Sequence, residues 1–96
     1  MDLFEKRMEI INKLKSYFIR NMVAMEREFN ISVPKNIITM SNMSFVAWVQ
    51  VRATKILMAK DVKECEDLKD LIVEFVKTEQ EVEIAETCII LSQQCM

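Results

Sequence analysis

The chain is 96 residues long, carries a net charge of −2, and contains no Gly and a single Pro. A chain of this length can enclose only one hydrophobic core, so we expect a single helical domain over residues 1–96. The absence of Gly removes the residue on which tight hairpin turns and phosphate-binding loops depend, which argues against a β-rich fold and against nucleotide-dependent catalysis.

The side chains that build catalytic and metal sites are scarce in this sequence. It has no His, which is the commonest general base and the commonest nitrogen ligand for metals. Cys65, Cys88 and Cys95 are odd in number and lack a Cys-x-x-Cys spacing, so we expect free thiols rather than a zinc site or a disulfide framework. We therefore expect no enzyme activity, no cofactor, no metal and no small-molecule substrate.

The sequence carries no signal for export or membrane insertion. Residues 1–7 lack the basic start and apolar run of a secretory signal, and no stretch approaches the roughly 18 apolar residues of a membrane span. We therefore expect a cytoplasmic protein. A composition rich in Ile, Lys, Asn and Met is associated with AT-rich genomes, and small helical proteins are common in viruses and phages, so a viral source would place it in the host cytoplasm.

Residues 2–30 show the clearest helical periodicity, with apolar side chains at steps of three or four. These positions are Phe4, Met8, Ile11, Leu14, Phe18, Met22, Met25 and Phe29. The pattern predicts one long amphipathic helix, with Asp2 as its N-cap and Asn30 as the left-handed residue after its end. Such a helix would span roughly 42 Å, more than the roughly 33 Å of a compact domain of this size, so we expect an elongated bundle or a projecting first helix.

Four apolar residues of this first helix are spaced seven positions apart, as in a coiled coil. They are Phe4, Ile11, Phe18 and Met25. Two chains can share such a heptad-like seam, which predicts a homodimer formed through the first helix.

The segment after the first helix contains Pro34, which disfavours helix just before it and suits the first turn of a new one. Residues 37–44 then form either a short helix or an ordered crossover. Met40, Met43 and Met58 lie near this crossover and either fill the core or line a groove for a partner, because clustered Met side chains adapt to protein surfaces.

The segment from about residue 42 or 44 to residue 59 is apolar on nearly every face. Its Val, Phe and Trp would also suit a β-strand, but no second strand is available to pair with it, so we predict a central, buried helix. Arg52 lies inside this segment, and a buried unpaired charge costs several kcal/mol. We therefore expect Arg52 to reach solvent, a partner or a carboxylate, the candidates being Glu64, Asp67 and Glu74.

Two capping-box patterns, Asp61 with Glu64 and Thr78 with Glu81, predict helix starts near Asp61 and Thr78. The break before each of these starts is either a loop or only a kink. Apolar residues recur at helical steps after both positions. They are Val62, Cys65, Leu68, Leu71, Ile72, Phe75 and Val76 after the first, and Val82, Ile84, Ala85, Cys88, Ile89, Leu91 and Cys95 after the second.

Charge is distributed unevenly along the chain. Residues 31–60 contain four basic and no acidic residues, whereas residues 61–96 contain three basic and ten acidic ones. Glu79, Glu83 and Glu86 fall on one helical face, which favours a solvated face or a pairing with a basic patch over a catalytic or cation-binding site.

The sequence therefore predicts an all-α fold, an elongated up-and-down helical bundle of three to four helices. We expect a non-enzymatic protein-protein interaction module, namely an adaptor, an inhibitor or a small chaperone-like factor, that acts through helix packing and forms a homodimer. The expected partner-binding residues are Phe4, Ile11, Phe18, Met25, Met40, Met43, Trp48, Arg52 and Lys55. The alternative is a small nucleic-acid-binding or transcription-regulatory protein that uses the basic middle segment and stacks a base on Trp48. Its contacts would be Lys35, Arg52, Lys55 and Lys60, with Lys13, Lys15 and Arg20 in support.

Overall fold

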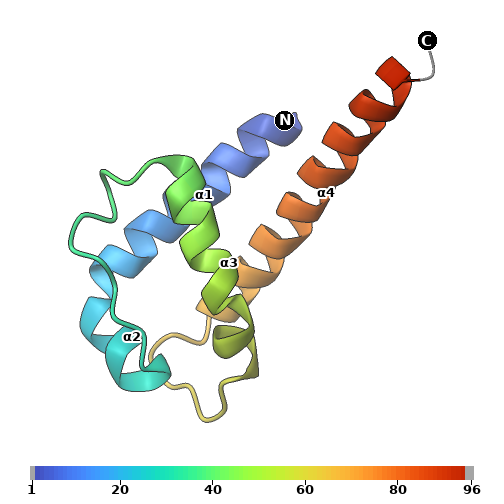
Figure 1. Cartoon of the computed structure of the whole chain (residues 1–96). Helices are drawn as coiled ribbons and strands as arrows, with labels where there is room; N and C mark the ends of the chain where they lie inside the picture. The colour runs from blue at the N-terminus through green and yellow to red at the C-terminus, as the bar shows by residue number, and fades with distance from the viewer. Residues whose placement is uncertain (1, 95–96) are drawn as a thin grey trace.

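The computed structural model describes residues 2–94, which form four helices, α1 (Leu3–Arg20), α2 (Met22–Phe29), α3 (Asn42–Met58) and α4 (Leu68–Gln94) (Figure 1). Within these residues there is no β-strand. Helix α1 packs against α2, α3 and α4, and α3 also packs against α4. The molecule measures 53 × 28 × 24 Å along its principal axes. The predicted all-α, elongated helical bundle is confirmed.

The predicted first helix is broken at Asn21, so that α1 and α2 replace a single helix. Its predicted ends are confirmed, because the Asp2 carboxylate accepts a hydrogen bond from the Glu5 N–H at 2.8 Å and Asn30 is left-handed at φ 54°. At the break, Asn21 has φ −123° and ψ 28°, and its side-chain amide donates to the Tyr17 carbonyl at 2.8 Å. Short polar side chains that bond to the backbone in this way compete with the helical hydrogen bonds, which accounts for the break.

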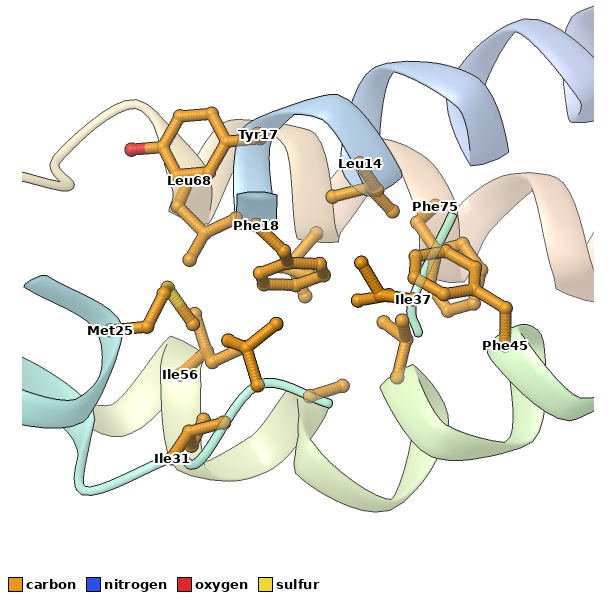
Figure 2. Close-up of a cluster of buried hydrophobic side chains, with 14 of the residues drawn as sticks. Leu14, Tyr17, Phe18, Met25, Ile31, Ile37, Phe45, Ile56, Leu68 and Phe75 are labelled. Atoms are coloured by element: carbon orange, nitrogen blue, oxygen red, sulfur yellow. The ribbon is translucent and has the colours of Figure 1, made fainter. Parts of the chain in front are cut away.

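The core lies where α1, α3 and the first half of α4 meet, and the crossover between α2 and α3 contributes to it (Figure 2). Phe18 packs edge to face against Phe45 and Trp48, with ring centroids 6.1 and 5.4 Å apart. Ile31 and Ile37 of the crossover are buried in the same cluster. The segment is therefore an ordered crossover rather than a short helix, held by burial worth about 1.5–3 kcal/mol for each such side chain.

Helix α3 confirms the predicted helix from residue 42, and Ser41 caps it by accepting a hydrogen bond from the Ser44 N–H at 3.2 Å. The expectation that this helix is buried on every face is wrong. Its buried side consists of Phe45, Val46, Val49, Ala53 and Ile56. On its other side, Val51 and Met58 are 78% and 72% exposed. The central position belongs to α1, which packs against three other helices.

Helix α4 is continuous from Leu68 to Gln94, so no helix starts at Thr78. The predicted break near Asp61 is a loop, but the helix after it begins only at Leu68, so the predicted helix start is wrong there as well. Asp61 lies in the loop before α4 with φ 60°, whereas an N-cap residue has extended backbone. Thr78 lies inside the helix and is 1% exposed, because the buried stripe continues through it without a Gly or Pro. Neither α4 nor any other helix in residues 2–94 combines the length and the apolar composition needed to cross a membrane.

Candidate functional site

Helices α1 and α4 are antiparallel, and side-chain contacts fix their register at both ends of the pair. Arg7 donates from Nε and Nη2 to the two carboxylate oxygens of Glu79, each at 2.8 Å. At the other end, the Tyr17 hydroxyl donates to Asp67 at 2.7 Å. Because α1 begins only four residues before Arg7, this register leaves α4 without α1 beside it from Ile84 onward.

The C-terminal part of α4 therefore projects beyond the rest of the bundle (Figure 1). We call its residues 84–93 the α4 overhang. They extend over roughly 15 Å at about 1.5 Å per residue. Four large apolar side chains of the overhang are more than half exposed, with Ile84 at 63%, Ile89 at 56%, and Ile90 and Leu91 at 53% each.

This exposure distinguishes the overhang from an ordinary soluble surface. Single exposed apolar side chains are common, but contiguous apolar patches of more than a few hundred Å² are rare on monomers and mark interaction sites. On the overhang the apolar side chains occur at consecutive helical turns, and Phe4 at the start of α1 is also 60% exposed. The arrangement is suited to binding the apolar surface of another macromolecule.

The glutamates that lie before and within the overhang are partly paired with α1. Glu79 holds the ion pair described above, and Glu81 lies 3.9 Å from Lys6, so the basic partner of this acidic run is the start of α1. Glu83 and Glu86 are exposed and form no ion pair within residues 2–94. The described part of the chain contains no group of three His, Cys, Asp or Glu side chains that could hold a metal ion.

The predicted dimer seam on the first helix is wrong. Ile11, Phe18 and Met25 are at most 1% exposed and belong to the core. Figure 2 shows Phe18 and Met25 among the buried side chains. Of the four residues in that spacing, Phe4 is the one that reaches solvent. Apolar residues at a seven-residue spacing form a stripe that is buried against another helix, and in this chain the other helices of the same molecule bury it.

The three Met residues near the crossover do not line one groove. Met40 is partly buried against the core, whereas Met43 and Met58 are 83% and 72% exposed. Met43 and Met58 lie at opposite ends of α3, roughly 22 Å apart along its axis. The interpretation of these residues as a groove is therefore wrong.

Trp48 and Arg52 contact each other on α3. The Arg52 guanidinium lies over the Trp48 ring, 4.4 Å from its centroid, and donates to the Trp48 carbonyl at 3.0 Å. The predicted pairing with Glu64, Asp67 or Glu74 is wrong, because no salt bridge involves Arg52 within the described range 2–94. A guanidinium that lies on an aromatic ring keeps its charge near the surface while its stem covers apolar atoms.

The basic residues of the alternative, nucleic-acid-binding function are dispersed, and three of them, Lys15, Arg52 and Lys55, donate hydrogen bonds to the chain's own backbone carbonyls. Lys55 donates to the Asn30 carbonyl at 3.1 Å, where its positive charge offsets the partial negative charge at the C-terminal end of α2. Arg52 is held on α3 as described above. Lys35 lines a hollow beside α2, whereas Lys60 lies with Lys55 in a different hollow at the end of α3.

A hollow of about 530 Å³ lies between α1 and the start of α4. Two pairs of its polar groups contact each other, because Tyr17 donates to Asp67 at 2.7 Å and Lys13 lies 3.0 Å from Glu9. Burial, followed by the hydrogen bond to Asp67, raises the pKa of the Tyr17 phenol. The phenol therefore stays protonated and acts as a donor that joins α1 to α4.

No local sequence signal predicts the polar junction by which α2 holds the loop before α4. The Glu28 carboxylate accepts hydrogen bonds from the N–H groups of Lys63, Glu64 and Cys65 at 2.6, 2.9 and 3.1 Å. These bonds, led by those from Glu64 and Lys63, lower the pKa of Glu28, while burial raises the pKa of the Cys65 thiol. The two sides of the junction are 35 to 37 residues apart, so only the fold brings them together.

The overhang is likewise a product of the fold rather than of its local sequence. The sequence places Ile84, Cys88 and Leu91 on one helical stripe, but the stripe has the same pattern whether it is buried or exposed. Ile90 lies on neither of the stripes predicted for this region. The signal that distinguishes the two cases is length, because the 27 residues of α4 extend beyond the 18 residues of α1.

The fold and the overhang together define a small all-helical protein with one projecting, apolar helix end. Comparisons with protein-family models, with curated protein sequences and with solved structures find no significant match to this chain.

Proposed function

We propose that this chain is a non-enzymatic protein-protein interaction module, namely an adaptor, an inhibitor or a small chaperone-like factor, whose docking surface is the α4 overhang. The observation that carries the proposal is the exposure of four large apolar side chains on a helix end beyond the reach of α1. Removal of such surface from water favours association by about 25 cal/mol per Å². A helix with apolar side chains on several sides fits a groove or a helical surface of another protein.

Charge supports a protein partner over a nucleic acid. Residues 78–93 contain four acidic and no basic residues, and two of these, Glu83 and Glu86, form no ion pair within residues 2–94, so their charge repels phosphates. The nucleic-acid alternative has less support, because Lys55 and Arg52 already contact the chain's own backbone or aromatic ring.

Affinity capture from the native cell, with mass spectrometry as the readout, tests the proposal. The baits are the wild-type chain, Leu91→Lys on the overhang and Val51→Lys on α3, each used with and without nuclease. Both substituted side chains are more than half exposed, so neither change disturbs the core. We expect the wild type and Val51→Lys to capture the same protein with or without nuclease, and Leu91→Lys to lose it.

Two outcomes of this experiment contradict the proposal. Capture that disappears on nuclease treatment supports the nucleic-acid alternative. Capture that survives Leu91→Lys means that the docking surface lies elsewhere on the molecule.

A further inference from the structure

One face of the overhang has the spacing of a short coiled coil. Ile84, Cys88 and Leu91 follow one another at steps of four and three, which correspond to the d, a and d positions of a heptad. All three are exposed, and they lie on the side of α4 opposite to Val82, which is buried against the bundle. We call these three residues the overhang seam.

The residues that flank the overhang seam carry no charge. In the same heptad the e and g positions are Ala85, Thr87 and Ser92, whereas Glu83 and Glu86 occupy the c and f positions, which point away from a partner helix. Charges at e and g normally select the partner of a coiled coil. A second copy therefore meets no like charge beside the seam, and the seam has no flanking charge that favours a different helix.

We infer that a second copy of this chain docks on the overhang seam. The inference rests on the proposed function, because it names the protein that the α4 overhang binds. The interface is a two-fold one, so Cys88 and Leu91 of each copy supply both of its sides, and Ile84 lies at its edge.

Charges outside the overhang select the antiparallel orientation. Toward the bundle, the next d and a positions are Lys77 and Glu81, both of which are exposed. In a parallel dimer each would face its own copy, and like charges at such positions destabilise the pair. In an antiparallel dimer only the overhangs overlap, with Cys88 beside the partner's Leu91, and the two bundles lie at opposite ends.

The short overlap makes the dimer weak. Two helices that overlap over roughly 15 Å bury less than the roughly 1,200 Å² of a standard stable interface. We therefore expect a monomer–dimer equilibrium with a dissociation constant in the micromolar range rather than a permanent dimer.

Sedimentation equilibrium of the full chain in reducing buffer, across micromolar concentrations, tests the pairing. The seam variant is Leu91→Lys, and the matched control is Ile90→Lys, because both side chains are 53% exposed and receive the same charge. Ile90 occupies a c position, off the seam. We expect Ile90→Lys to dimerise as the wild type does, and Leu91→Lys to weaken dimerisation at least about tenfold, because an unpaired ammonium would enter the apolar seam.

A wild-type chain that stays monomeric over this range, or an equal weakening by both substitutions, overturns the inference. If the chain is monomeric and Leu91→Lys still abolishes capture of a protein, the proposed function stands and only the identity of the partner is wrong. If the chain is monomeric and no capture depends on Leu91, the proposed function fails as well.

Cross-linking tests the orientation. In a background with Cys88→Ser and Cys95→Ser, the Lys77→Cys variant places its thiol at the d position that precedes the overhang seam, while Cys65 is buried. A short bismaleimide joins two such thiols in a parallel dimer, whereas in the antiparallel dimer they lie roughly 38 Å apart along the helix axis. In samples shown to dimerise by sedimentation, we expect a cross-linked dimer through Cys88 in Cys95→Ser and none through Lys77→Cys. A cross-link through Lys77→Cys overturns the antiparallel orientation.

Discussion

Arg7 and Glu79, 72 residues apart in the sequence, form a two-bond ion pair that joins α1 to α4. The Glu79 side chain is 11% exposed and that of Arg7 is 28% exposed, so water screens this pair only partly. The nearby Lys6 and Glu81 are 3.9 Å apart and lie in solvent, at 40% and 52% exposure. Because the α1–α4 register decides how much of α4 projects, the pair of Arg7 and Glu79 helps to position the candidate site, together with the Tyr17–Asp67 contact at the other end.

Double-mutant cycles will separate these two ion pairs. For Arg7→Met and Glu79→Gln we expect a coupling free energy of about 1–2 kcal/mol, because two aligned, shielded hydrogen bonds between charged groups are lost together. For Lys6→Met and Glu81→Gln we expect less than about 0.5 kcal/mol, as is typical of exposed pairs. Urea unfolding of all variants gives these values, and equal couplings in the two cycles would contradict the prediction.

Phe18 and Phe4 belong to the same seven-residue spacing but will respond oppositely to truncation. Phe18→Ala will lower the free energy of unfolding by about 3–5 kcal/mol, because the fully buried ring leaves a cavity between α1 and α3. Phe4→Ala, at a 60% exposed position, will change it by less than about 0.5 kcal/mol. Urea unfolding measures both. If Phe18→Ala does not fold, Phe18→Leu supplies the comparison, with an expected loss of about 1–2 kcal/mol. A loss no larger than that of Phe4→Ala would mean that Phe18 does not face the core.

The sequence predicts those features of the fold that depend on neighbouring residues. The Asp2 cap, the left-handed Asn30 and the start of α3 each follow from a few adjacent side chains, and the structure confirms them. The break at Asn21 is only partly predictable from neighbouring residues. An Asn side chain is compatible with a helix interior as well as with a bond to the carbonyl of Tyr17, and the sequence does not distinguish the two conformations.

Features that depend on contacts between distant residues are not predictable in this way. Thr78 and Glu81 have the spacing of a capping box, yet the same spacing occurs inside a helix whose buried side continues through it. The stripe that contains Ile84 and Leu91 would be core if α1 extended beside it. Core packing and the polar contacts at both ends of α1 and α4 set their relative position, so exposure of the stripe follows from the register and not from the pattern.

Glu28 will make the stability of the fold depend on pH in the acidic range. Its pKa is lowered from the ordinary value of 4.5 by backbone N–H donors, those of Glu64 and Lys63 first. A lowered pKa in the folded state means that the carboxylate stabilises the fold fully above the unfolded-state pKa, and that this contribution is lost as pH falls through the folded-state value. Glu28→Gln will therefore lower the melting temperature at neutral pH, and its difference from the wild type will shrink below about pH 4.

The control for this pH series is Glu26→Gln, because Glu26 lies two residues before Glu28 on α2 and is exposed. Its melting temperature should follow that of the wild type at every pH, because its carboxylate accepts no hydrogen bond from the loop within residues 2–94. Thermal unfolding followed by circular dichroism gives both curves. A pH-independent difference for Glu28→Gln would show that the carboxylate charge is not what holds the loop.

Arg52 will stabilise the fold modestly, and we expect this stabilisation to persist at high salt. Arg52→Met loses the cation–π contact with Trp48, which is worth about 0.5–1 kcal/mol at a partly exposed site. A salt bridge to a carboxylate would instead weaken as ionic strength rises. Urea unfolding at low and high salt, followed by the fluorescence of the chain's single Trp, distinguishes the two. A loss that vanishes at high salt would indicate a carboxylate partner for Arg52.

The sign of the change in unfolding free energy caused by Thr78→Val distinguishes a helix interior at Thr78 from a helix start. The residue is 1% exposed, and its Oγ1 has no hydrogen-bond partner within residues 2–94. An unsatisfied buried hydroxyl costs about 1–3 kcal/mol, so Thr78→Val will raise the free energy of urea unfolding by about 1 kcal/mol, whereas the loss of an N-cap would lower it by a similar amount. Thr54→Val, at an exposed position of α3, should change it by less than about 0.5 kcal/mol. A destabilised Thr78→Val would mean that a helix begins there, and the overhang would then no longer be a rigid continuation of the part of α4 that α1 holds.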